Sequence, residues 1–367
     1  MSTIKVNTID NNGSNVDFPN KLTVRGNAIE QGYTASGTEP SSPSAGDFWW
    51  DSTNSVLYQY ISSEFKKVSL APPMSWGGDR AVTTTDSSGY KYYTITTPSA
   101  ASTFGDYSTS HNHDRGAACS SKTRGLFAGG SDGGTFTNII EYITIASAGN
   151  GTDFGDLVGT FYYMAAASNG TRALFGAGYK DGASSSNESN DIQYVTIATT
   201  GNATDFGDLT DTLIGVTASS DVTYVLFFGG RNSVRNNIDY VTAATAANAT
   251  DFGDMTYSAS EHGAVSDATR SIHVGGYTGS SVTNSMGYVT TATQGNATDF
   301  GDLTVARYGM GTANNKTVAV FFAGPNASYA ANNTIDQCVI QTAGNCTDFG
   351  DMPANQEESI SCAGDAS

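Results

Sequence analysis

The sequence has little of what membrane proteins and most enzymes need. Only 14% of its 367 residues are charged, and it holds four Cys and four His. No stretch shows the sustained i, i+3, i+4, i+7 apolar spacing of a long amphipathic helix, and no run approaches the roughly 18 apolar residues of a membrane span. We therefore expect no helical domain, no membrane insertion and no disulfide framework.

Basic residues are also scarce. Lys and Arg total 17 against 35 Asp and Glu, which gives a net charge of −18. A surface of this sign repels phosphate backbones, so binding to nucleic acid is disfavoured.

Glycine is abundant, with 42 residues, and the tripeptide Phe-Gly-Asp recurs six times at intervals of 46 to 52 residues. The six copies begin at Phe104, Phe154, Phe206, Phe252, Phe300 and Phe349. A period near 50 in a Gly-rich chain is typical of a β-propeller, in which each repeat is one small sheet packed beside the next. The sequence therefore predicts an all-β protein with a six-bladed propeller over residues 71–367.

Each repeat has a fixed part. A Tyr stands 12 residues before the Phe in five units, and Gln337 takes its place in the sixth, which predicts a hairpin about a Gly-Asn turn. Farther upstream an apolar run ends in small residues, as in Leu126-Phe-Ala-Gly-Gly130, and we assign Trp76-Gly-Gly78 to this place in unit one. The Gly/Ala-rich stretch before each run suits the crowded innermost strand.

Unit one has no inner strand of its own. Residues 353–365, after the last Phe-Gly-Asp, align with the inner-strand segments of the other units. We therefore predict that the C-terminus completes blade one and closes the ring. The same alignment places Cys119 and Cys362 on the inner strands of neighbouring blades, near the channel, and we expect free thiols there.

One interval in the repeat varies in length. From the Gly pair to the Tyr it runs from 10 to 16 residues, and insertions confined to one connection mark a place where function can vary. These loops are rich in Tyr, Ser, Gly and Asn, a mixture found in adaptable recognition surfaces and also in ordinary turns. Tyr would stack on sugars there, with Asn and Arg as hydrogen-bonding groups. The candidate receptor-binding residues are Tyr179, Lys180, Asp181, Arg231, Asn232, Arg235, Tyr277, Asn326 and Tyr329.

Catalytic motifs find little support. Asp-Phe-Gly imitates a kinase motif, but it recurs five times without a Gly-rich loop or a catalytic-loop sequence. The paired Asp of each repeat favour turn capping over Ca²⁺ binding, since two carboxylates supply too few oxygens. His111 and His113 are candidate metal ligands, although exposed positions are the commoner home of His. No carboxylate pair suggests a glycosidase. We predict no catalytic residue and no cofactor.

The N-terminal region differs from the repeats. Residues 1–34 are too few to bury a core, so we expect a docking or oligomerisation segment. Residues 35–70 comprise a linker, 35–46, and a small β module in which residues 48–68 form two strands about a Ser-Thr-Asn turn.

Two resemblances extend this reading. The diglycine after an apolar strand, followed by Tyr and a further aromatic residue, resembles kelch repeats, except that Phe replaces Trp and the spacing from Tyr is longer. The segments Ile4-Lys-Val-Asn-Thr-Ile9, Thr38-Glu-Pro-Ser-Ser-Pro43 and the Thr-Asp-Phe-Gly-Asp-Leu units are similar to tail-fibre and other virion proteins of marine bacteriophages.

The second resemblance implies a non-enzymatic virion appendage that is assembled in the host cytoplasm, in keeping with the absence of a signal peptide. Its N-terminal region would dock on other virion proteins, with a homotrimer as first expectation. The propeller would present its variable loops to a host cell-surface glycan or lipopolysaccharide. The alternatives are a purely structural baseplate, fibre or capsid component and, with less support, a glycan depolymerase.

Overall fold

The computed structural model describes most of the chain. Its described residues are 22–24, 27–29, 33–36, 38–42, 47–51, 56–61, 63–67, 79–85, 89–97, 102–109, 113–132, 134–231, 233–267, 269–315, 317–328, 330–356 and 362–364. The chain divides into two compact units, Met1–Ala71 and Pro72–Ser367.

The first unit holds two small sheets. β1 (Leu22–Val24) pairs with β2 (Asn27–Ile29), and a second sheet has the order β3 (Tyr33–Ser36), β4 (Phe48–Asp51), β5 (Val56–Ile61), β6 (Glu64–Lys67). β3 and β4 are parallel, and the other pairs are antiparallel. The buried ring of Trp49 stacks on Tyr58 at 4.9 Å and meets Phe65 edge-on. The expected two strands within residues 48–68 are three, since β6 pairs with the free edge of β5 and its Phe65 extends the aromatic cluster.

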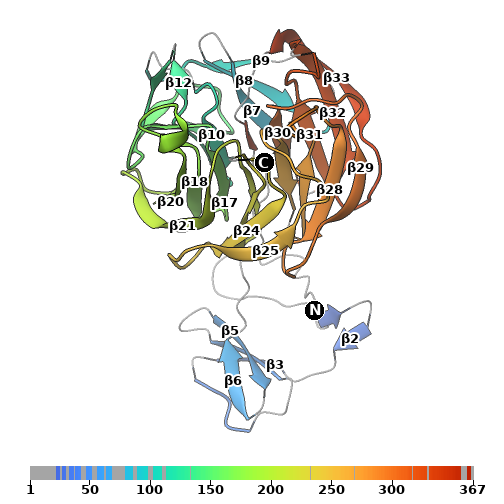
Figure 1. The fold of residues 1–367 in the computed structure, drawn as a ribbon. Coiled ribbons are helices and arrows are strands. Elements are labelled where there is room, and N and C mark those ends of the chain that lie inside the picture. The colour runs from blue at the N-terminus through green and yellow to red at the C-terminus, as the bar shows by residue number, and fades with distance from the viewer. Residues whose placement is uncertain are drawn as a thin grey trace. The chain divides into compact units, whose positions relative to one another are not determined.

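The second unit is a six-bladed β-propeller, as predicted. Figure 1 shows six sheets arranged around a common axis, and each blade is an antiparallel sheet of four strands. The innermost strands are β34 (Cys362–Gly364), β10 (Ala117–Ser120), β17 (Ala165–Ser168), β22 (Thr217–Ser220), β26 (Gly263–Ser266) and β30 (Gly311–Asn314). The second strands are β7 (Arg80–Thr85), β11 (Arg124–Ala128), β18 (Arg172–Gly176), β23 (Tyr224–Phe228), β27 (Arg270–Val274) and β31 (Val318–Phe322).

The third and outermost strands contain the fixed part of the repeat. The third strands are β8 (Gly89–Thr94), β14 (Ile139–Thr144), β20 (Ser189–Thr196), β24 (Asn237–Thr242), β28 (Ser285–Thr290) and β32 (Asn332–Val339). The outermost strands are β9 (Ser102–Gly105), β15 (Thr152–Asp156), β21 (Thr204–Leu213), β25 (Thr250–Asp254), β29 (Thr298–Asp302) and β33 (Thr347–Gln356). Phe-Gly-Asp lies on the outermost strand, where its Phe is buried.

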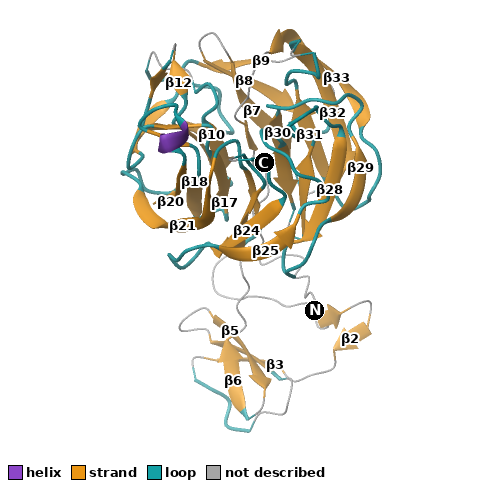
Figure 2. Ribbon diagram, in the orientation of Figure 1, coloured by secondary structure: helices purple, strands orange, loops and turns teal. Residues whose placement is uncertain are grey.

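Helix is almost absent from the part of the chain that the structure describes (Figure 2). The one helix there is the 3-10 turn η1 (Ser185–Asn187), and no helix among these residues is long and apolar enough to cross a membrane.

The C-terminal strand closes the ring. β34 pairs with β7, with Cys362 opposite Thr83, and it lies beside β10 and β30 of the two adjoining blades. The first part of the predicted closing segment, through Gln356, instead continues the outermost strand β33. Cys119 is a buried free thiol on β10, which confirms the neighbouring-strand placement; the side chain of Cys362 lies outside the described residues.

Unit one corrects our assignment of Trp76-Gly-Gly78. Its second strand is β7, in which Arg80 pairs with Thr94 as Arg124 pairs with Thr144 in blade two. The Gly pair therefore precedes this strand and does not follow it. A lone Gly pair near an aromatic residue imitates the repeat pattern without occupying its place.

The two faces of the ring differ. Successive turns of an antiparallel meander fall on opposite faces. The turns between the first two strands and between the last two are short, and they define the constant face. The loops between the second and third strands, together with the connections between blades, define the variable face. The small strands β12 (Ser131–Asp132), β13 (Thr135–Phe136), β16 (Phe161–Tyr162) and β19 (Tyr179–Lys180) all belong to the variable face.

The Gly of the motif is required by the next blade. In five blades a Cβ on this Gly would lie 2.1 to 2.6 Å from backbone atoms of the Gly-Asn turn of the following blade. The Asn of that turn accepts a hydrogen bond from the backbone N–H of the motif's Asp at 3.0 to 3.2 Å. Each turn thus covers the outer edge of the preceding blade. The recurring Asn are turn residues, as predicted, and they cap the motif in five blades. In blade six Asp348 caps it as we expected of Asp, since its carboxylate accepts from the Gly350 N–H at 3.0 Å.

The inner edges are tied in the same direction. Hydroxyl or amide groups of Ser168, Ser220, Ser266 and Asn314 donate to a backbone carbonyl of the preceding inner strand at 2.5 to 2.7 Å. At the constant face, four Arg stack on the repeat Tyr at 4.5 to 4.7 Å and donate to a carbonyl of the following blade. These are Arg80, Arg124, Arg172 and Arg270.

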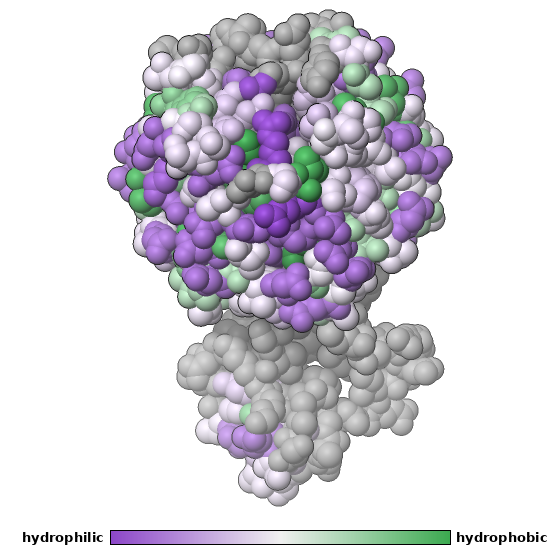
Figure 3. Space-filling view, viewed as in Figure 1, coloured by the Kyte–Doolittle hydropathy of each residue, from purple (hydrophilic) through white to green (hydrophobic). Residues whose placement is uncertain are grey.

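The described surface offers no large apolar patch. The exposed large hydrophobic residues among those described are Val158, Val305 and Val339, which lie singly. Figure 3 shows the ring as mainly hydrophilic in this view, with small hydrophobic spots between polar ones. A partner of this surface must therefore be recognised mainly through polar and aromatic groups.

Candidate functional site

Three of the candidate residues occupy the same repeat position. Arg231 and Tyr277 each follow a Gly pair directly, and Tyr179 follows Ala177-Gly178 at the equivalent place. Each forms a β-bridge or strand pair with the connection that leads into its own blade: Tyr179 with Tyr162, Arg231 with Ile214, and Tyr277 with Ser260. Because these three blades are consecutive, the side chains fall in one row on the variable face.

This row lines a groove of about 530 Å³. Its walls comprise Tyr179, Glu188, Ile214, Arg231, Ser233, Val234, Tyr277 and Gly279. The sequence predicted that the three candidate residues contact one receptor, and the structure brings them together. Their role in binding stays a prediction.

Backbone hydrogen bonds join five successive blades in a partial ring at the channel mouth, beside this groove. We call the residues that they join the ring residues. The residues are Arg115, Tyr163, Gly215, Glu261 and Gly309, one from each of five successive blades. The N–H of each of the last four donates to the C=O of the preceding one at 2.6 to 3.1 Å. All five have φ between 51° and 62°, the left-handed region. Gly215 and Gly309 adopt it freely, whereas the side chains of the other three make it costly.

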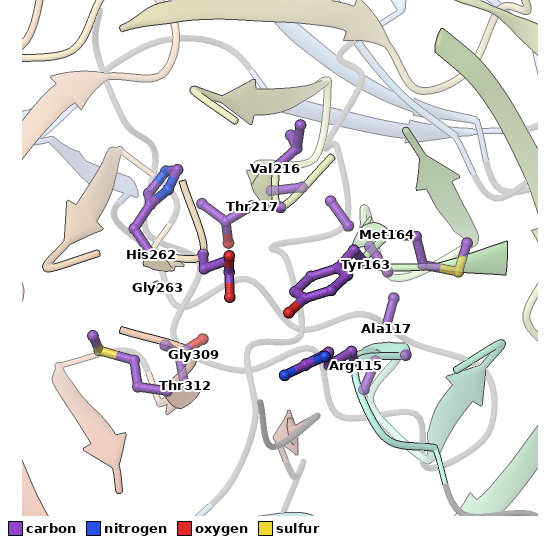
Figure 4. A pocket seen from close by; sticks show the side chains of 18 residues that line it. Arg115, Ala117, Tyr163, Met164, Val216, Thr217, His262, Gly263, Gly309 and Thr312 are labelled. Carbon is purple, nitrogen blue, oxygen red and sulfur yellow. The ribbon is translucent and has the colours of Figure 1, made fainter. Parts of the chain in front are cut away.

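The side chains of Arg115, Tyr163 and Glu261, the three ring residues other than Gly, line one pocket. A cavity of about 120 Å³ at the channel mouth is lined by all five ring residues together with the first residues of the inner strands. In Figure 4 the side chains of Arg115, Tyr163 and Thr217 reach into the pocket from three different blades, while the imidazole of His262 points away from its centre. Gly215 leaves room for Glu261, whose Cγ would lie 3.0 Å from a Cβ at position 215.

Charged and aromatic groups form a continuous chain here. The Arg115 guanidinium donates to the Tyr162 hydroxyl and lies 4.6 Å from the Tyr163 ring centre. The Arg231 guanidinium lies 5.7 Å from the centre of the Tyr163 ring and forms an ion pair of 3.1 Å with Glu261. The Glu261 side chain is 7% exposed and that of Arg231 is 37% exposed. Burial and the nearby Glu261 carboxylate raise the pKa of Tyr163, so its hydroxyl is neutral and can donate. We call Arg115, Tyr162, Tyr163, Arg231 and Glu261 the mouth cluster.

The other candidates lie on the same face but have local partners. Lys180 pairs with Asp191, and Asp181 accepts hydrogen bonds from Thr160. Arg235 forms an ion pair with Asp211 at 3.1 Å.

Asn326 accepts hydrogen bonds from the backbone of Ser328 and Ala330, so its side chain holds its own loop. Asn232, Tyr329 and His111 lie outside the described residues.

His113 belongs to a buried network. Its Nδ1 lies 2.9 Å from the Gly129 carbonyl, and its Nε2 is 3.5 Å from Glu141. Glu141 is fully buried and accepts hydrogen bonds from the Tyr90 hydroxyl and the Ser108 backbone at 2.7 and 2.9 Å. No group of three His, Cys, Asp or Glu with metal-site geometry occurs among the described residues. The metal assignment stays untested, since His111 is not among them.

Our expectation of exposed His is wrong for the three described ones. His262 and His273 are also buried, with ring centres 6.5 Å apart. Burial lowers the pKa of His262 to about 3, so it is neutral at pH 7. Blades two, three, four and six have a buried carboxylate or amide at one position of the third strand, and blade five has Gly287 there. The His273 ring fills the space that this side chain would occupy, since its Nε2 would lie 2.4 Å from a Cβ at position 287.

Acid should destabilise the propeller because it protonates the Glu141 carboxylate. Burial pushes its pKa up, but hydrogen bonds from His113 and Ser108 outweigh burial and hold it at about 2, against 4.5 unfolded. A lowered pKa adds stability above pH 4.5 that is lost as pH falls towards 2, about 3 kcal/mol for this shift. Urea unfolding at pH 7, 4 and 3 measures it. Glu141→Gln should be less stable at pH 7 and lose less on acidification; parallel losses in the two proteins would contradict the assignment.

Sequence analysis missed the five residues whose backbones are hydrogen-bonded around the channel mouth. A signal does exist: Tyr163, Gly215, Glu261 and Gly309 each stand nine residues after the Phe of the motif, and Arg115 stands eleven after it because the first of these connections is two residues longer. A fixed position that holds Gly twice and Arg, Tyr or Glu elsewhere indicates a left-handed backbone with varied side chains.

Comparison with known proteins adds no identity to this geometry. No protein-family model matches the chain, and no curated protein matches it. The six-bladed propeller, consistent with kelch-like repeats, is thus what the fold itself establishes.

Proposed function

We propose that this protein is a non-enzymatic recognition protein that binds a cell-surface glycan or lipopolysaccharide through the variable face of its propeller. The observation that carries the proposal is the mouth cluster, in which Arg115, Tyr163 and Glu261 point functional side chains toward one pocket from strained backbone positions.

Strain is the reason to regard this cluster as selected for function. A left-handed backbone costs a non-Gly residue on the order of 1 kcal/mol, and such costs collect at binding and catalytic sites. Gly215 and Gly309 show that Gly fits this ring position in the same fold. Stability alone would favour Gly at 115, 163 and 261 as well.

The chemistry of the cluster suits a sugar. Arg115 and Tyr163 can donate hydrogen bonds, Glu261 can accept them from hydroxyl groups, and aromatic rings stack on the apolar faces of pyranose rings. Tyr179 and Tyr277 extend this surface along the groove. A hydrolytic role has less support, because glycoside hydrolysis uses two carboxylates across the bond and the Glu261 carboxylate is already paired with Arg231.

The virion setting is part of the proposal and rests on the resemblance of the sequence. The polypeptide enters the ring at β7, and second strands begin at the constant face. In this proposal the preceding segment docks on other virion proteins, as a homotrimer, and the variable face binds the host surface.

Gly substitutions at the ring separate recognition from folding. Arg115→Gly, Tyr163→Gly and Glu261→Gly should each keep the free energy of unfolding within about 1 kcal/mol, since relief of strain offsets lost contacts. Each should weaken binding to host-surface polysaccharide at least about tenfold, the loss of roughly one charged or aromatic contact. Binding is measured by biolayer interferometry with immobilised polysaccharide, and unfolding by urea titration. Lys122→Ala, an exposed residue of the constant face, is the matched control.

Two outcomes would contradict the proposal. A wild-type protein that retains no host-surface polysaccharide would favour the purely structural role. Wild-type affinity in all three Gly variants and the control would remove the mouth cluster from the binding surface.

A further inference from the structure

One junction between blades has a different chemistry from its equivalents. At three successive junctions an Ile from one third strand packs against a Val and an Ala of the next blade. The sets are Ile140 with Val195 and Ala203, Ile192 with Val241 and Ala249, and Ile238 with Val289 and Ala297. At the next junction all three positions carry sulfur: Met286, Cys338 and Cys346.

The three sulfur atoms converge. The Cys346 Sγ lies 3.4 Å from the Met286 Sδ. Cys338 on β32 and Cys346, directly before β33, stand opposite each other, one step beyond the paired residues Gln337 and Thr347. Cys338 and Cys346 are both free thiols, 7% exposed, and Met286 is fully buried.

Packing does not require sulfur at these positions. Met, Cys and Cys fill about the same space as Ile, Val and Ala, so the three apolar residues of the other junctions would serve equally well in the core. Sulfur adds the capacity to bind a soft metal ion. Two thiolates and a thioether are the donor set that Cu(I) prefers. We propose that Met286, Cys338 and Cys346 form a Cu(I) site at the junction between blades five and six.

A buried ion pair lies in the same blade. Arg307 is fully buried and pairs with Asp336 at 2.9 Å, and its Nε has no hydrogen-bond partner. Cu⁺ binds thiolates, so binding to two thiols releases two protons and the apparent affinity rises with pH.

Competition with a chromogenic chelator tests the site. The full chain, reduced and kept anaerobic, is titrated into the Cu(I)–bicinchoninate complex at pH 6 and pH 8. One equivalent of Cu(I) should be withdrawn, more tightly at pH 8. The variant Met286→Ile/Cys338→Val/Cys346→Ala restores the residues of the other junctions, so it should fold, which circular dichroism checks. It should withdraw at least about tenfold less Cu(I).

A second variant, Cys119→Ser/Cys362→Ser, removes the other two thiols and should keep the wild-type equivalent. Equal withdrawal by the wild-type protein and the triple variant would overturn the proposal. Loss of binding in the Cys119/Cys362 variant alone would also overturn it, by moving the ion to the channel. Neither outcome depends on glycan binding, so this inference stands or falls separately from the proposed function.

Discussion

Ending the chain after Gln356 is expected to lower the free energy of unfolding of the propeller by roughly 5 kcal/mol, a large part of the 5–15 kcal/mol that holds a typical domain. The deletion removes β34, which pairs with β7 at three positions and contacts the inner strands on both sides. A few backbone hydrogen bonds at about 1 kcal/mol each are lost, and the edge that Val82 and Thr83 occupy is exposed to solvent.

Urea unfolding followed by tryptophan fluorescence and circular dichroism measures this effect. A chain that ends at Gly364 keeps β34 and is the matched control, which should unfold at the wild-type urea concentration. A synthetic peptide of residues 355–367 should restore stability to the shorter chain when added in excess. Equal midpoints for the two truncated chains would show that β34 does not close the ring.

The second large effect is expected at the buried ion pair of blade six. Arg307 and Asp336 are both fully buried and lie 2.9 Å apart, and Asp336 also accepts from the Thr304 hydroxyl at 2.5 Å. Asp336→Ala leaves the guanidinium without its counter-charge in the interior and should cost about 3–5 kcal/mol in the free energy of unfolding. Urea unfolding measures this change.

Two further variants make the cause identifiable. The double variant Arg307→Met/Asp336→Leu removes both charges and should lose less than Asp336→Ala alone, since no uncompensated charge remains. Asp191→Ala breaks the half-exposed pair with Lys180 and should cost under about 1 kcal/mol. A double variant less stable than Asp336→Ala would show that packing, and not charge, sets the cost.

Much of this fold could be predicted because the repeat is a physical constraint at every copy. The Gly of Phe-Gly-Asp recurs because the next blade leaves no space for a Cβ, and the 12-residue spacing to Tyr recurs because one turn fixes the hairpin register. Closure by the C-terminus followed from counting strands per unit. The placement of Trp76-Gly-Gly78 was wrong because the propeller begins within unit one. No earlier repeat precedes this segment, so its spacing could not be compared with that of the other units.

The candidate site was only partly within reach of the sequence. Length variation indicated the loops that carry Tyr179, Arg231 and Tyr277, which share one groove. Tyr163 and Glu261 lie in connections of constant length, and the connection that holds Arg115 is only two residues longer, so the same criterion passed over them. Their significance depends on a positive φ and on convergence across blades, and neither property can be read from residue type alone. The roles of buried His113 and Glu141 were also hidden, because a polar residue on a strand does not reveal which strand faces it.

The inter-blade contacts described above repeat in one sense around the axis: turns and hydroxyl groups reach back to the preceding sheet, and guanidinium groups reach forward to the following one. Each junction is therefore a heterologous, head-to-tail interface, with unlike surfaces on the two sides of every sheet. Such an interface can be lengthened or shortened by whole units without inventing a new contact. Gene duplication could thus alter the circumference of this molecule while leaving the chemistry of its joints unchanged.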